Sequence, residues 1–292
     1  MLDLSSLNDA QKEAVLTCEG PLLVLAGAGS GKTRVLTYRI AHLVEDCGVA
    51  PWNILAVTFT NKAAREMRDR LSTLAAGRLR GMWIYTFHSM CVRILRSHAT
   101  VLGYSDDFTI YDTDDSKRLI KDIMADYGYT GRSFSENAMR ARISACKNEL
   151  VSPADYKPRV NDQLDKAFAE VFKAYQQRLK RANAMDFDDL LVNVYTLLSE
   201  HPDICQEYGQ RFHYILVDEY QDTNKAQYEI TKLLASGHGN LMVVGDDDQS
   251  IYSWRGADIR NILDFERDWP DTKTIKLEEN YRSTSTILQC AN

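Results

Sequence analysis

Six short runs of apolar, often β-branched residues are spread along the chain, with helical patterns between most of them. The runs are Leu22–Leu25, Ile54–Phe59, Met82–Phe87, Tyr214–Val217, Leu241–Val244 and Thr274–Leu277. Strands that are apolar throughout are typical of a parallel sheet whose two faces are both covered by helices. The pattern therefore predicts an α/β fold built on a parallel sheet.

The long segment between the third and fourth runs, roughly Tyr104–Tyr208, lacks strand signals. Apolar residues recur there with helical spacing. The helices predicted in this segment are Ser116–Tyr127, Glu136–Leu150, Leu164–Arg181 and Phe187–Leu198. The sequence thus predicts an all-helical domain, residues 104–208, inserted into a sheet domain that residues 1–103 and 209–282 form together.

The composition is that of an ordinary globular protein, with 45% hydrophobic and 26% charged residues in a chain of 292. No apolar run approaches the length of a membrane span, and the first residues lack the basic and apolar regions of a signal peptide. Six cysteines, with no CxxC pair among them, stand at positions 18, 47, 91, 146, 205 and 290. This scatter favours reduced, structural thiols in a cytoplasmic protein without a membrane partner, rather than a disulfide framework or a zinc site.

Charge is unevenly distributed along the chain. The formal net charge is −6, but residues 61–96 carry eight Lys or Arg against two acidic side chains. The local distribution of charge matters more for binding a polyanion than the sum does. Aromatic and polar side chains accompany this stretch, namely Phe59, Thr60, Thr86, Phe87 and His88. A charge run is usually a solvated helix face, but this combination favours a nucleic-acid surface.

The stretch Ala26-Gly27-Ala28-Gly29-Ser30-Gly31-Lys32-Thr33 follows the first apolar run and precedes a helical pattern. A strand, a glycine-rich turn and a helix form the context of a phosphate-binding loop. The glycines let backbone N–H groups turn inward around phosphate oxygens, and the helix N-terminus favours the same anion. In such a loop Lys32 reaches the β- and γ-phosphates of a nucleoside triphosphate, and the Thr33 hydroxyl holds Mg²⁺. Ala26 departs from the general pattern, which begins with glycine.

An acidic pair, Asp218 and Glu219, ends the fourth apolar run. The carboxyl ends of parallel strands are where open α/β sheets bind ligands. Asp218 is suited to hold Mg²⁺ through water, and Glu219 to polarise an attacking water molecule as general base. A strand that ends in Asp-Glu is common by itself. Together with the phosphate-binding loop it predicts nucleotide hydrolysis.

Further motifs in the sequence are more specific than the two features that NTPases in general share. Val217–Asp222 resembles the second motif of superfamily 1 DNA helicases of the UvrD/PcrA/Rep type. Further stretches resemble other motifs of that family and follow in the family's order: Leu7–Gln11, Thr58–Ala64, Tyr85–Ser89, Asp186–Leu190, Val244–Ala257 and Glu279–Ser283. The most specific of them is Val244–Ala257. The resemblance covers most of the chain and implies a RecA-like P-loop NTPase core (1A) with a helical insert (1B), residues 283–292 beginning a second RecA-like domain that is missing.

The resemblance also implies roles around the nucleotide. Gln11 would read the adenine edge, and Tyr281 and Arg34 would sandwich the base. Gln249 would sense the γ-phosphate, because an amide can donate to a phosphate oxygen and accept from water. Arg282 would stabilise charge on the transferred phosphoryl group as an arginine finger. For Arg34 a solvated helix position is the alternative.

Contact with single-stranded DNA is implied for the motifs at the second and third strand ends and for the segment after the fifth. The residues concerned are Phe59, Thr60, Asn61, Thr86, Phe87, His88, Tyr252, Trp254 and Arg255. Tyr252 and Trp254 lie two positions apart, so in an extended segment they would share a face and stack bases. Core packing is the alternative for both, and for Phe59 and Phe87 the two alternatives stay open.

Two sets of potential metal ligands are expected to have other roles. His88 is expected to hydrogen-bond DNA phosphate or a neighbour, because no second ligand lies at metal-binding spacing. Asp186, Asp188 and Asp189 are expected to stabilise a helix N-terminus and the local structure.

Taken together, these features imply an ATP-dependent 3′–5′ DNA helicase and translocase that uses ATP and Mg²⁺. Single-stranded and duplex-junction DNA are the implied partners, with repair or replication proteins as partners of the full-length protein. Two alternatives stay open. In the first alternative, this portion alone binds nucleotide and DNA without unwinding. In the second, it is the helicase part of a nuclease–helicase of the RecB/AddA type.

Overall fold

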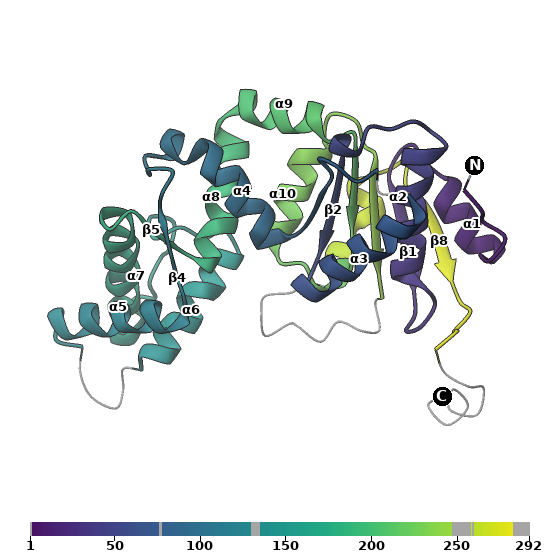
Figure 1. Ribbon diagram of the computed structural model, residues 1–292. Coiled ribbons are helices and arrows are strands. Elements are labelled where there is room, and N and C mark those ends of the chain that lie inside the picture. The colour runs from purple at the N-terminus through teal and green to yellow at the C-terminus, as the bar shows by residue number, and fades with distance from the viewer. Residues whose placement is uncertain (1, 76–77, 130–134, 247–257, 259, 283–292) are drawn as a thin grey trace. The chain divides into compact units, whose positions relative to one another are not determined.

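The computed structural model describes residues 2–75, 78–129, 135–246, 258 and 260–282. The chain divides into two compact units (Figure 1). The first unit contains Met1–Met90, His201–Asn224 and Thr231–Asn292, and the second contains Cys91–Glu200 and Lys225–Ile230. The second unit thus interrupts the first along the sequence. Its limits in the structure differ from the predicted 104–208.

A parallel sheet forms the centre of the first unit, and its described strands number six in the order β3-β2-β6-β7-β1-β8. The strands are β1 (Leu22–Ala26), β2 (Ile54–Thr58), β3 (Trp83–Thr86), β6 (Tyr214–Val217), β7 (Leu241–Gly245) and β8 (Lys273–Leu277). Every pairing in this sheet is parallel, so all six carboxyl ends lie at one edge. The six predicted strands are present, and the predicted α/β fold class is confirmed.

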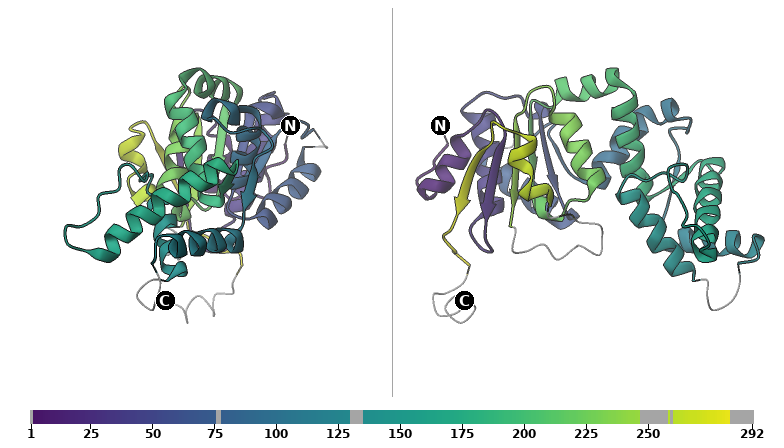
Figure 2. Two further views of the ribbon diagram at one scale, coloured as in Figure 1. Left: turned by 90° about the vertical axis from the view of Figure 1, so that its left-hand side faces the viewer. Right: turned by 180° about the vertical axis from the view of Figure 1, so that it is seen from behind.

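Helices cover both faces of this sheet. On one face lie α1 (Asp9–Leu16), α2 (Lys32–Glu45) and α3 (Asn61–Leu74), which share a core with alternate strand residues (Figure 1). On the other face lie the short helices α11 (Arg260–Leu263) and α12 (Phe265–Asp268), seen from behind in Figure 2. Each fully buried Leu or Val in such a core stabilises the fold by roughly 1.5–3 kcal/mol.

The first unit contains further helical elements. They are η1 (Pro51–Asn53), α9 (Pro202–Arg211), η3 (Tyr220–Asp222), and parts of α4 (Phe87–His98) and α10 (Lys225–Ala235), both of which contribute residues to each unit. None of the described helices is long and apolar enough to cross a membrane.

The second unit is mainly helical but not entirely so. Its helices are η2 (Ala99–Leu102), α5 (Thr113–Asp126), α6 (Glu136–Asn148), α7 (Gln163–Arg181) and α8 (Phe187–Glu200). Strands β4 (Thr109–Tyr111) and β5 (Ala184–Asp186) form a parallel pair beside them. The expectation of an all-helical insert is therefore corrected. Three-residue strands are too short for alternation to appear in the sequence.

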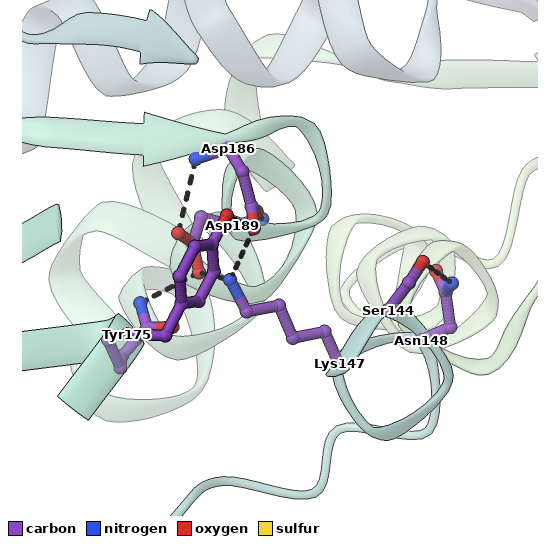
Figure 3. A network of polar contacts seen from close by, with 7 residues as sticks. Ser144, Lys147, Asn148, Tyr175, Asp186 and Asp189 are labelled. Carbon is purple, nitrogen blue, oxygen red and sulfur yellow. Dashed lines mark hydrogen bonds and ion pairs between the residues drawn. The ribbon is translucent and has the colours of Figure 1, made fainter. Parts of the chain in front are cut away.

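A buried polar network holds the start of α8 (Figure 3). The Lys147 Nζ atom lies 2.7 Å from a carboxylate oxygen of Asp186 and 2.8 Å from one of Asp189, and the Tyr175 hydroxyl donates to Asp186. The backbone N–H of Asp189 donates to the Asp186 carboxylate, and the N–H of Asp186 donates to the Asp189 carboxylate. This reciprocal pairing is a capping box. The predicted helix N-terminal role of these two aspartates is confirmed.

Electrostatics inside the network favour the charged ion pair. Burial opposes the charge on Lys147, but Asp186 and Asp189 outweigh it and raise the pKa of the ammonium group. Burial also opposes the charge on Asp186, but Lys147 holds the pKa of this carboxyl below its ordinary value. Burial, with Asp186 beside it, raises the pKa of Asp189 to about 6. The lysine is thus the cation on which both buried carboxylates depend.

We expect Lys147→Met to lower the free energy of unfolding by about 3–5 kcal/mol at neutral pH, because it leaves two buried carboxylates without a cation. Without Lys147 the folded-state pKa values of the aspartates rise above the unfolded values. Stability is then retained at low pH and lost as pH rises. Urea denaturation at about pH 5 and about pH 8 should therefore give the smaller deficit at the lower pH. Exposed Lys173→Met, on α7, is the control, and a deficit independent of pH contradicts the prediction.

Candidate functional site

The turn between β1 and α2 requires glycine at two positions. Gly29 has φ of 74° and Gly31 has φ of 93°, a region in which other residues are strained. A Cβ atom on Gly29 would lie 2.5 Å from the Cβ of Arg282, and one on Gly31 would lie 2.8 Å from Nε2 of Gln11. Conformation and close packing therefore both exclude a side chain. The structure also brings Gln11 and Arg282, predicted from distant parts of the sequence, against this loop.

Two segments from opposite ends of the described chain hold the loop by its carbonyl groups. Gln11 Nε2 donates to the Ser30 carbonyl at 2.9 Å, and the Tyr281 N–H donates to the Gly29 carbonyl at 2.9 Å. Asn8 links the two segments. Its Oδ1 accepts from the Gln11 N–H at 2.8 Å, and its Nδ2 donates to the Tyr281 hydroxyl at 2.8 Å. Contacts from both α1 and the segment after β8 therefore support the loop.

The segment after β8 makes a further contact with the loop. Asn280 Nδ2 donates to the Ala28 carbonyl at 2.6 Å, and Asn280 Oδ1 accepts from the Arg282 N–H at 2.9 Å. The Arg34 guanidinium lies 5.6 Å from the ring centroid of Tyr38, on its own helix. Tyr281 is 56% exposed. The predicted sandwich of a base between Arg34 and Tyr281 stays a prediction.

Lys32, the first residue of α2, lies between two carboxylates. Its Nζ atom is 3.5 Å from Glu219 Oε2 and 3.7 Å from Asp246 Oδ2. Glu219 comes just after β6 and Asp246 directly after β7, and the two strands pair in parallel. The shared edge of the sheet therefore brings both acids to the end of the phosphate-loop helix. Of these three residues, Lys32 and Glu219 were predicted from the sequence, and Asp246 was not.

Asp218 is buried beside this cluster. Burial, and after it the neighbouring Glu219, raises the pKa of the Asp218 carboxyl to about 7. Its Oδ1 atom accepts the Glu219 N–H at 3.0 Å, and Glu219 itself has a left-handed backbone with φ of 49°. A strained non-glycine residue of this kind is typical of functional sites. A dication would supply the positive charge that the buried Asp218 needs, and oxygen ligands such as Asp218 and the Thr33 hydroxyl suit Mg²⁺.

Gln221 connects the acids. Its side chain is almost fully buried, its Nε2 donates to Glu219 Oε2 at 2.9 Å, and its Oε1 accepts the Asp246 N–H at 3.1 Å. The sequence placed Gln221 and Asp246 within the motifs Val217–Asp222 and Val244–Ala257 but gave neither a role in the nucleotide site. Asp246 carries the signal that identified Asp218, a carboxylate directly after an apolar strand. Gln221 carries no such signal, since its function depends on a contact with β7.

The residues after β2, predicted to contact DNA, begin α3. The Thr60 Oγ1 atom accepts the Ala63 N–H at 3.0 Å and caps the helix. Asn61 and Lys62 are exposed in its first turn, and Phe59 is half-buried. The exposed polar residues are open to a ligand at the carboxyl edge of the sheet.

The residues after β3 are more enclosed. The Thr86 hydroxyl donates to Ser89 Oγ at 2.9 Å, which ties the end of β3 to the first turn of α4. Phe87 is only 3% exposed, so the core alternative fits the structure better than a base-stacking surface. Burial lowers the pKa of His88, which favours its neutral form. The predicted residues Gln249, Tyr252, Trp254 and Arg255 lie outside the described part of the chain.

Three features together define a P-loop nucleotide-binding fold. They are the parallel sheet covered by helices, the glycine loop that leads into a helix starting at Lys32, and the acidic residues that follow the neighbouring strands β6 and β7. Residues 7–270 match the UvrD/REP helicase N-terminal domain, and the chain belongs to this family. Over 289 residues it is 53% identical to the ATP-dependent DNA helicase PcrA of Staphylococcus aureus and 52% identical to that of Staphylococcus epidermidis. These alignments cover 99% of this chain and 40% of each relative, so the chain spans less than half the length of the curated relatives it matches. The resemblance seen in the sequence is confirmed.

We expect Gln221→Met to lower the free energy of unfolding by about 1–3 kcal/mol, because methionine keeps the volume but leaves the buried Asp246 N–H and the Glu219 carboxylate without the amide. Urea denaturation measures this loss. Gln206→Met, at an exposed position of α9, is the matched control and should change little. Equal stability of the two variants would show that the amide bridge is unimportant.

Proposed function

We propose that this chain is the ATP-hydrolysing, DNA-binding portion of a 3′–5′ DNA helicase and translocase. The observation that carries the proposal is the position of Lys32, within 4 Å of Glu219 and Asp246 at the end of the phosphate-loop helix. Membership of the UvrD/REP family supports it. So do the relatives, which are named ATP-dependent DNA helicases.

Lys32 is suited to exchange its partners when nucleotide binds. Its distances of 3.5 and 3.7 Å exceed those of a charge-assisted hydrogen bond, so neither carboxylate holds it tightly. The phosphate oxygens of ATP would compete with Glu219 and Asp246 for the ammonium group. Glu219, kept in position by the Gln221 amide, would then be free to accept a proton from the attacking water molecule.

Thr33 and Asp218 are the residues that would hold Mg²⁺. The buried Asp218 carboxyl, whose pKa is raised to about 7, would be kept ionised by a dication. Mg²⁺ would supply charge that offsets the negative charge of the phosphates. Gln11 would read the adenine edge, and Tyr281 and Arg34 would enclose the base. Gln249 and Arg282 would respond to the γ-phosphate.

The nucleotide and DNA segments are neighbours in the sheet. The Asp218 N–H donates to the Val57 carbonyl at 2.9 Å, one residue before Thr58, which begins the predicted DNA motif. A displacement of the segment that carries Thr60 and Asn61 would therefore be transmitted to Asp218 and Glu219 through this single backbone hydrogen bond. We infer that this bond is one route by which DNA binding stimulates hydrolysis.

We expect Lys32→Ala to lower the rate of ATP hydrolysis by roughly 10²–10³-fold, because a charge directed at the phosphates is lost. Glu219→Gln should lower kcat by a similar factor while ATP still binds, since only the base is removed. Turnover is measured with and without single-stranded DNA, which should increase it. Lys166→Ala, at an exposed position of α7, is the control.

Two results would oppose the proposal. A chain that binds ATP and DNA without hydrolysis would favour the binding-only alternative. Turnover that is insensitive to Lys32→Ala would locate the chemistry elsewhere. The alternative of a nuclease–helicase receives less support, because the PcrA relatives match 99% of the chain. A cytoplasmic location, duplex-junction DNA, and repair or replication proteins as partners stay predictions.

We expect Lys62→Ala to weaken binding of single-stranded DNA to a similar extent for every base sequence, because the exposed ammonium at the start of α3 would contact phosphate. The slope of log K against log salt concentration should fall by about one. Fluorescence anisotropy of a labelled oligonucleotide across a salt series measures both effects. Lys273→Ala, at the amino end of β8 and therefore at the opposite edge of the sheet, should leave the slope unchanged. The same slope in both variants contradicts the assignment.

A further inference from the structure

Three side chains with metal-ligand atoms converge where α1 and α2 end. Cys18 follows α1 directly after its C-cap, His42 lies in the last turn of α2, and Cys47 follows that helix. The Sγ atoms of Cys18 and Cys47 are 4.0 Å apart, and Cys47 Sγ is 3.6 Å from His42 Nε2. One ligand atom from each residue lies within 4.8 Å of the other two. Cys18 and Cys47 are far apart in the sequence, so no metal-binding motif with a short spacing predicts the cluster.

The separations of Cys47 Sγ from Cys18 Sγ and from His42 Nε2 are close to those between the ligands of a tetrahedral zinc ion. With Zn–S bonds of about 2.3 Å and Zn–N bonds of about 2.0–2.1 Å, two sulfurs lie about 3.8 Å apart and a sulfur and a nitrogen about 3.6 Å apart. The third pair, Cys18 Sγ and the imidazole nitrogen of His42, lies within 4.8 Å and would have to approach to about 3.6 Å for the cluster to close around the ion. Cys47 is exposed, which gives the ion a path to the site.

The imidazole of His42 is already oriented as in a metal site. Its Nδ1 atom lies 2.8 Å from Asp46 Oδ2, and Asp46 Oδ1 accepts the Leu2 N–H at 3.0 Å. If Nδ1–H donates to the carboxylate, Nε2 carries the lone pair and lies 3.6 Å from Cys47 Sγ. A carboxylate that holds the far nitrogen of a histidine is typical of zinc ligation, because it sets the tautomer and raises the basicity of the ligand.

The backbone on the Cys18 side is fixed by a buried arginine. Arg39, from the middle of α2, is 2% exposed and donates to the carbonyls of Ala14, Thr17 and Cys18. It thereby closes the C-terminal end of α1 and holds Cys18 beside α2. The carbonyl end of α2 also carries the negative pole of the helix dipole, which favours a cation. The backbone at Cys18 is therefore held in place by contacts that need no metal ion.

We propose that Cys18, His42 and Cys47 bind one Zn²⁺ ion, with water as the fourth ligand. Two Zn–S bonds and one Zn–N bond form, and each thiol releases its proton to solvent. The donor set of two thiolates and one imidazole favours Zn²⁺ over Mg²⁺, which prefers oxygen. The ion would cross-link the ends of α1 and α2. Because Lys32 begins α2 and the cluster lies at its other end, about 20 Å along the helix, the site is separate from the nucleotide site.

The test titrates the reduced chain with Zn²⁺ and, in parallel, with Co²⁺ as a spectroscopic probe. We expect one ion per chain and, for Co²⁺, a thiolate charge-transfer band together with the visible bands of tetrahedral cobalt. Cys47→Ser and His42→Gln should lose these signals. Asp46→Asn, which keeps every ligand, should weaken affinity about 10–100-fold. Cys205→Ser, a half-buried cysteine outside the cluster, is the matched control.

Binding should also raise the melting temperature of the parent chain and leave that of Cys47→Ser unchanged. A reduced chain that binds no Zn²⁺ overturns the proposal. So does a stoichiometry that Cys47→Ser and Cys205→Ser share. ATP turnover is not a readout here, so failure of this proposal leaves the proposed hydrolytic function untouched, and the reverse also holds.

Discussion

The site depends on one ion-pair cluster, in which Lys32 at the start of α2 lies between Glu219 and Asp246. The three residues come from three separate parts of the chain, and only the parallel pairing of β1, β7 and β6 brings them to one edge. The Lys32 side chain is 11% exposed and that of Asp246 5%, so either charge alone would be costly to bury. The loose contacts of about 3.5 Å suit the proposed role of Lys32, in which it would leave these carboxylates for phosphate oxygens. A tighter pair would be more stable but would compete with the ligand.

The phosphate loop has a second constraint, because its carbonyl groups are held from outside. Gln11 and Tyr281 contact it from opposite ends of the described chain, and Asn8 hydrogen-bonds to both. The close approach explains why Gly29 and Gly31 cannot carry a side chain. It also means that residues expected to contact the nucleotide are at the same time part of the loop's support. A substitution at Gln11 would therefore change loop geometry as well as base recognition.

Much of this arrangement follows from local sequence patterns. Apolar runs predicted the six strands of the sheet. The glycine loop after one strand and the acidic pair after another predicted the two sides of the proposed nucleotide site. What could not be predicted depends on contacts between distant segments. Gln221 acts only because β7 places the Asp246 N–H against it. The proximity of Cys18 to Cys47 depends on the packing of α1 beside α2, where Arg39 of α2 donates to the Ala14 and Cys18 carbonyls. Strands β4 and β5 are too short for their alternation to be seen.

One helix relates the two sites. The N-terminal end of a helix presents backbone donors without intrahelical partners and a partial positive charge, which suit a phosphate, and the C-terminal end carries the opposite charge. Lys32 stands at the first end, and His42 and Cys47 stand at the second. The helix between them is anchored in the core by a buried face that includes Val35, Leu36 and Ile40. An ion that ties the far end of α2 to α1 would restrain the same helix, α1, from which Gln11 reaches the phosphate loop.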